Sequence, residues 1–138
     1  AAGVAAAVLV LATGAPFAAA APHAGKWVGK VTKGEVGPGA KGKPRFKVTS
    51  NGKELKSFVI PEVAGFCFTG AQAITVAVPK AKIHAGRVDV NYVIRNNPPD
   101  AKPTVHLTGK FTSKTTFKGE VTGKHYCDYD VQFTSHPG

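Results

Sequence analysis

Apolar and polar residues alternate along most of the second half of this chain and in shorter stretches of its first half. A period of two is typical of β-strands that bury one face. The alternation predicts strands over 26–32, 45–49, 54–60, 73–78, 87–95, 104–112, 116–122 and 126–134. No stretch shows an apolar repeat of 3.6, so the sequence predicts no helix.

Turn residues separate these stretches. Asn51-Gly52 predicts a hairpin, because both residues tolerate positive φ. Pro61 and Pro79 are predicted to end the strands before them. Loops rich in Gly, Pro and Lys are predicted over 33–44 and 96–103.

About eight short strands, each with one apolar face, predict an all-β fold, either an antiparallel β-barrel or a β-sandwich. Gly29, Gly109 and Gly119 fall on inward positions, where glycine permits tight strand coiling, and this favours the barrel. The strands occupy 21–138, which we expect to form a single domain.

The first 20 residues carry no charge and consist of an apolar run that ends in alanines. This pattern is typical of a secretory signal peptide, and cleavage after Ala20 suits it best because Pro22 follows Ala21. An uncleaved membrane anchor is the alternative. Either reading predicts a secreted or cell-envelope protein.

Cys67 and Cys127 are the two cysteines of the chain. Export would place them in an oxidising compartment, where a pair has one intramolecular connectivity. We expect a disulfide bond; two buried thiols or a reactive cysteine are the alternatives.

The stretch from Gly25 to Thr32 resembles the start of a group of small exported β proteins of actinobacteria. Their mature chains open with Gly-x-Trp/Tyr-x-Gly-x-Thr, carry a central Cys and close with Gly-x-Phe-x-Ser/Thr hairpins and a second Cys. Gly109 to Ser113 and Cys127 match that layout. The resemblance implies no activity. Gly25-x-Trp27 is also similar to the first strand of lipocalin-like and avidin-like barrels, which implies a similar architecture.

Catalytic and metal-binding patterns are weak. The five histidines lack the spacing of a metal site, and no serine lies in Gly-x-Ser-x-Gly. Asp128, Asp130 and Glu120 share a predicted strand face and could bind Ca²⁺ or act as an acid/base pair. Ion pairing with nearby lysines is the preferred reading. We therefore expect neither an enzyme nor a metal or cofactor.

Charge is the most informative feature for function. The 18 Lys and Arg residues exceed the 8 Asp and Glu residues and give a net charge of +10. Acidic wall polymers, glycans or anionic lipid headgroups are natural partners, whereas nucleic acid is not expected for an exported chain without Arg clusters. The alternative is that lysines only keep strand edges soluble. The candidate polyanion-binding residues form two sets, Lys110, Lys114, Lys118 and Lys124 in the first and Lys41, Lys43, Arg45 and Lys47 in the second.

Two other functions remain open at this point. A barrel interior can hold a small apolar ligand, with Trp27 as a candidate pocket residue. A loop over 96–103 could act as a protease inhibitor. We expect the protein to be a monomer.

Overall fold

The computed structural model describes residues 21–34, 42–94 and 104–138. The predicted signal peptide, Lys41 and the loop over 96–103 lie outside these residues. Within them the fold is all-β, with eight strands and no helix, as the alternation predicted. The strands are β1 (Gly25–Lys33), β2 (Arg45–Val48), β3 (Glu54–Cys67), β4 (Gly70–Lys82), β5 (Arg87–Val93), β6 (Thr104–Ser113), β7 (Thr116–Lys124) and β8 (Cys127–Pro137).

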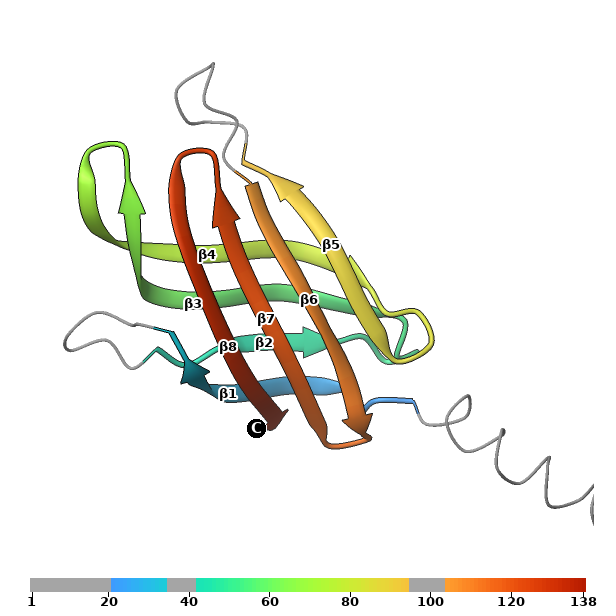
Figure 1. The fold of residues 1–138 in the computed structure, drawn as a ribbon. Coiled ribbons are helices and arrows are strands. Elements are labelled where there is room, and N and C mark those ends of the chain that lie inside the picture. Colours follow the sequence, from blue (N-terminus) through green and yellow to red (C-terminus); the bar gives the residue numbers. More distant parts are fainter. Residues whose placement is uncertain (1–20, 35–41, 95–103) are drawn as a thin grey trace, which may run out of the picture.

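All strands belong to one antiparallel sheet with the order β4-β3-β2-β1-β8-β7-β6-β5. Each half of the chain is a meander of four strands, and the pairing of β1 with β8 joins the two halves. In Figure 1, β5–β8 form one layer that crosses over the layer of β1–β4. The end of β3 also pairs with the start of β8, so β1, β2, β3 and β8 close into a barrel.

Aromatic rings fill the space between the two layers. Trp27 stacks on Phe46 with ring centroids 5.5 Å apart and meets Phe111 edge-on at 5.2 Å. Phe117 bridges the layers, with its centroid 5.5 Å from that of Phe46 and 5.8 Å from that of Phe133. The inward positions expected from the alternation in β1 and β5–β8 therefore form the core, since large buried rings dominate core energetics.

Glycines on inward positions make room for these rings. A Cβ at Gly109 would collide with the ring of Phe117, and one at Gly119 would collide with the rings of Phe133 and Phe117. The barrel was predicted partly from these glycines, and their contacts show why larger residues would not fit.

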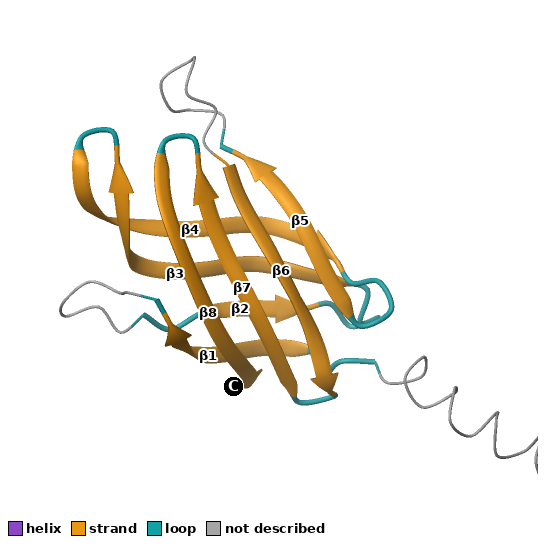
Figure 2. Ribbon diagram, viewed as in Figure 1, coloured by secondary structure: helices purple, strands orange, loops and turns teal. Residues whose placement is uncertain are grey.

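Residues with positive φ occur in several of the turns between neighbouring strands. Gly52 has a φ of 71°, and its N–H donates to the carbonyl of Thr49 at 2.9 Å. The predicted Asn51-Gly52 hairpin is therefore confirmed between β2 and β3. Ala85 and Gly86 have φ values of 50° and 74° and connect β4 to β5. Figure 2 shows these turns at the ends of the strands.

The prediction that Pro61 and Pro79 end strands was wrong. β3 continues past Pro61 to Cys67, because the register against β4 shifts between Ile60 and Val63. β4 runs through Pro79, which lies on the edge strand of the sheet opposite Ser57, and the ladder has no pair at this position. Each proline lies at such an irregularity, where the missing N–H breaks no regular ladder.

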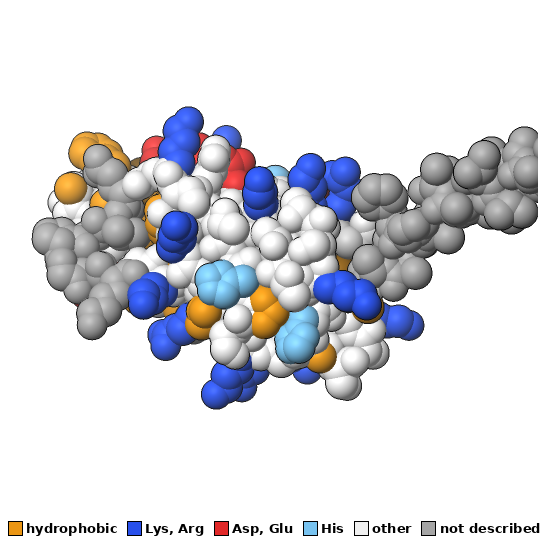
Figure 3. Space-filling model, turned by 90° about the horizontal axis from the view of Figure 1, so that it is seen from below, with side chains coloured by type: hydrophobic (Ala, Val, Ile, Leu, Met, Phe, Trp, Pro, Cys, Tyr) orange, Lys and Arg blue, Asp and Glu red, His pale blue; other side chains and the backbone are white. Residues whose placement is uncertain are grey.

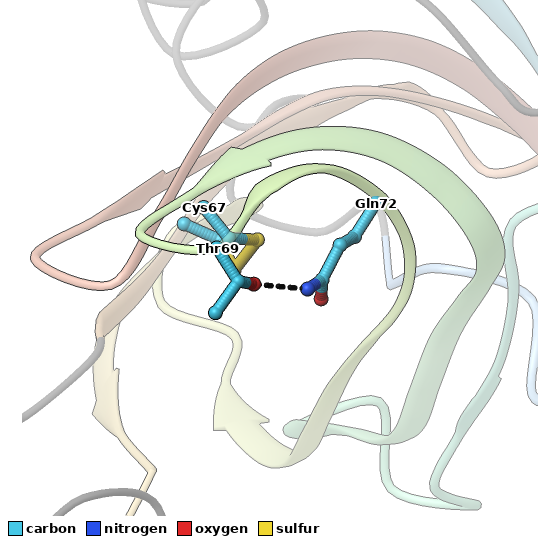
Figure 4. Close-up of a disulfide and its surroundings, with 4 residues drawn as sticks. Cys67, Thr69 and Gln72 are labelled. Atoms are coloured by element: carbon cyan, nitrogen blue, oxygen red, sulfur yellow. Dashed lines mark hydrogen bonds between the residues drawn. A yellow bond between two sulfur atoms is a disulfide. The ribbon is translucent and has the colours of Figure 1, made fainter.

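The expected disulfide joins Cys67 and Cys127, which are direct cross-strand partners on β3 and β8. Figure 4 shows it beside Thr69 and Gln72, whose side chains hydrogen-bond to each other near the tip of the β3–β4 hairpin. The bond connects two residues 60 positions apart and fastens the two halves of the sheet at this end of the barrel.

Candidate functional site

The register of the sheet places basic residues opposite one another. In the half of the sheet formed by β1–β4, Lys26 of β1 is the cross-strand partner of Lys47 of β2. Lys47 is also the partner of Lys56 of β3. Lys56 in turn faces Lys80 of β4. We call Lys26, Lys47, Lys56 and Lys80 the lysine row. Because neighbouring strands are about 4.8 Å apart, the four Cα atoms span about 14 Å.

All four side chains of the lysine row are exposed. The residues next to them in each strand point inward, as Trp27, Phe46 and Leu55 do. The alternation of the strands therefore turns the row outward as one line across the sheet.

A second basic row crosses the other half of the sheet. Arg87 of β5 faces Lys110 of β6, which faces Lys118 of β7. The next partners along the same line are Thr134 of β8 and Lys30 of β1. The two rows meet at β1, where Lys26 and Lys30 lie on the same outward face.

A shallow groove of about 490 Å³ lies against the lysine row on the outer face of β1, β2 and β3. Val28 and Val59 provide apolar surface in it, and both are cross-strand partners of Arg45. Lys26, Arg45 and Lys47 also line the groove. Figure 3, seen from below Figure 1, shows Lys and Arg side chains scattered over that side of the molecule, while Asp and Glu gather at one part of its edge.

The sequence grouped four lysines that the structure only partly brings together. Lys110 and Lys118 are direct partners, and Lys114 lies at the turn between their strands. Lys124 lies at the other end of β7, six residues from Lys118, or roughly 20 Å along the strand. Of the second set, Lys47 belongs to the lysine row, Arg45 lines the groove, and Lys43 is exposed just before β2.

The preferred reading of the acidic residues was wrong. Among the described residues, the ion pair within 4.0 Å is that of His106 with Asp89, at 2.7 Å. No carboxylate there lies within that distance of Lys110, Lys118 or Lys124.

The three carboxylates of that predicted face also have separate neighbours. Glu120 accepts a hydrogen bond from Gln132, Asp130 faces Thr122, and Asp128 faces Phe66. The described part of the chain contains no group of three His, Cys, Asp or Glu residues placed to hold a metal ion.

Trp27, the candidate pocket residue, is 1% exposed and packed between other rings. Its indole N–H donates to the carbonyl of His23 at 2.7 Å. This hydrogen bond satisfies the one polar group of the side chain and fixes it as part of the core.

The sequence reasoning did not single out Lys26, Lys56, Lys80, Lys30 or Arg87. The pairing of Lys56 with Lys47 could have been predicted from the sequence. A two-residue hairpin turn at Asn51-Gly52 places these two lysines opposite each other. The other pairings join strands that are distant in sequence or depend on a register shift, and alternation alone gives no register between such strands.

None of the described residues forms a helix of the length and apolarity needed to span a bilayer. Comparison of the chain with protein-family models, curated proteins and solved structures finds no match.

Proposed function

We propose that this protein is a non-catalytic binding module that holds anionic polymers, rich in phosphate or carboxylate groups, against the outer face of β1–β4. The lysine row is the observation that carries this proposal. It offers four exposed ammonium groups in a line, with no carboxylate of the described residues within 4.0 Å of them.

The lysine row has no internal benefit to the fold. Like charges directly opposite each other in a sheet are destabilising, and here three consecutive cross-strand pairs are Lys–Lys. Protection of an edge strand against aggregation would account for Lys80 on β4, but it does not account for lysines on the inner strands β1, β2 and β3. A polyanion bound along the row would neutralise this repulsion.

The chemistry of lysine fits a repeating anion better than a single small one. Its ammonium group is a hydrated point charge on a flexible stem, and it attracts phosphate and carboxylate without a fixed orientation. A line of about 14 Å can contact several successive charges of a polymer at once. The apolar surface of Val28 and Val59 in the adjacent groove would contact the uncharged backbone of such a polymer.

The compartment predicted from the sequence suits this partner. The Cys67–Cys127 bond is consistent with an oxidising location such as the extracellular space or the cell envelope. Anionic polymers of the envelope are present there, so we place the site of action outside the cytoplasm.

The test is retention on immobilised polyphosphate and on immobilised polygalacturonate. A Lys26/Lys47/Lys56/Lys80→Gln variant should elute at much lower salt than the wild type. Binding of the wild type should fade as the screening length shortens from about 10 Å at 0.1 M salt to about 3 Å at 1 M. The salt concentrations that elute the wild type from the two resins show whether the protein prefers phosphate or carboxylate groups.

A matched control removes the same charge elsewhere. Lys33, Lys53, Lys114 and Lys124 are exposed and lie at turns or strand ends, outside the lysine row. Their joint replacement by Gln should leave most of the retention intact. Equal losses in the two variants would mean that only net charge matters, and would contradict a defined site on β1–β4.

A further inference from the structure

A pocket of about 270 Å³ opens at the end of the barrel beside the disulfide, away from the lysine row. It lies between β4 and the ends of β5–β8. Its apolar walls are formed by Ile74, Ile94 and Val105, and Lys124, Tyr126 and Tyr129 provide polar groups. The sequence reasoning placed a possible ligand beside Trp27, whereas this pocket lies at the other set of strand ends.

Close contacts hold the pocket walls in place. Tyr129 lies across Gly123, its direct partner on β7, so closely that a Cβ on the glycine would collide with the ring. On the opposite side, Ile74 packs over Gly65, where a Cβ would lie 3.1 Å from its Cδ1. The Cys67–Cys127 bond then ties these two walls together, and Cys127 itself lines the pocket.

The polar groups of the pocket favour an anion. Among the described residues that line it, Lys124 is the one charged residue and none is a carboxylate. Burial raises the pKa of the Tyr129 hydroxyl, so this group stays protonated at neutral pH and can donate a hydrogen bond. A lining that combines a hydroxyl donor, an ammonium group and apolar side chains matches one carboxylate attached to an apolar body.

We propose that this pocket binds a small organic anion with a compact apolar body, such as an aromatic or branched-chain carboxylate. The apolar body lies against Ile74, Ile94 and Val105, while the carboxylate faces Lys124 and Tyr129. The volume is just below the range of about 300–1,000 Å³ that holds drug-sized ligands, so the ligand is a monocyclic or short-chain molecule. This site is independent of the polymer-binding surface proposed above.

The test is a titration of the full chain with phenylacetate, followed in ¹H–¹⁵N NMR spectra. Saturable shifts should appear at Gly123, Thr75 and Thr104, which lie in or beside the pocket. 3-Methylbutanoate should compete, and the neutral phenylacetamide should bind severalfold more weakly. Absence of saturable shifts with both acids, or shifts confined to the lysine row, would overturn the proposal.

Variants locate the site. Lys124→Gln and Tyr129→Phe should each weaken phenylacetate binding severalfold, whereas Lys114→Gln, an equal change of charge at another turn, should not. Phe66→Ser removes an exposed aromatic ring from β3 near the disulfide, 71% exposed and not part of the pocket lining, and should leave binding unchanged. Wild-type affinity in Lys124→Gln and Tyr129→Phe would contradict the assignment. Retention of Lys124→Gln on polyphosphate should stay near that of the wild type, which separates this proposal from the polymer-binding one.

Discussion

At the residue scale, the described glycines differ in the room that they leave for a side chain. Gly123 leaves the least, because the Tyr129 ring packs directly on it. Gly123→Ala should destabilise the protein by about 1–3 kcal/mol, because the added Cβ would overlap the Tyr129 ring and force it to move. Denaturant unfolding followed by Trp27 fluorescence measures the loss.

Gly65→Ala is the matched control for this change. Its Cβ would meet the terminal Cδ1 of Ile74 at 3.1 Å, and that end of a flexible side chain can shift aside. The loss should therefore be smaller than that of Gly123→Ala. A larger loss at Gly65 would mean that the Tyr129 ring has room to relax.

Tyr129 also predicts a dependence of stability on alkaline pH. Burial raises its pKa in the folded protein above the usual 10.0, so the unfolded chain ionises first as pH rises. The stabilising effect is complete below about pH 10 and is lost above it. Tyr129→Phe should therefore lose less free energy of unfolding between pH 9 and 11 than the wild type does. Parallel pH profiles for the two proteins would contradict this.

At the element scale, the lysine row should lower the stability of the strands that carry it. Lys47→Gln and Lys56→Gln should each raise the thermal midpoint at low salt, because each removes like-charge repulsion from two cross-strand pairs. The gain should disappear near 1 M salt, where repulsion is screened. Thermal melts in the two salt conditions check this, and Lys114→Gln at its turn should change little.

Alternation predicted the inward faces of most elements, because one face of each strand packs on a common core. The strands around Val105, Leu107 and Phe117 were placed correctly for that reason. The two errors, at Pro61 and Pro79, share a cause: proline was read as a strand end. A register shift between Ile60 and Val63 accommodates Pro61, and Pro79 lies on the edge strand β4, where the ladder skips one pair. Both arrangements depend on the partner strand and leave no mark in the local pattern.

The candidate sites were harder to predict from the sequence. The pair Lys110–Lys118 follows from its short turn, but the full lysine row requires the pairing of β1 with β2 across a long connection. The pocket beside Lys124 requires strands from both halves of the chain to meet. Neither arrangement can be derived from residue types, since both depend on register.

At the scale of the whole molecule, the disulfide closes the barrel at the end where β3 leaves β2 and reaches β8. The bond joins residues 60 positions apart and so restricts the conformations of the unfolded chain. Its removal should lower the free energy of unfolding by about 4 kcal/mol. Cys67→Ser/Cys127→Ser should therefore unfold at much lower denaturant than the oxidised wild type.

Addition of a reductant is the companion measurement. It should lower the midpoint of the wild type toward that of the double serine variant and leave the variant itself unchanged. If reductant leaves the denaturation midpoint of the wild type unchanged, the disulfide bond does not stabilise the folded protein.

The ladder between β1 and β8 has a consequence for the time at which this protein can fold. β1 cannot complete its pairing until β8 has been synthesised, so the barrel cannot close before then. Pairings between distant strands are also slow to form, on a scale of milliseconds to seconds for all-β domains. The barrel therefore stays open until β8 is available, and a chain that has not closed its barrel is a form that can be threaded through a narrow translocation channel. The order in which its strands meet thus suits the export predicted from its first 20 residues.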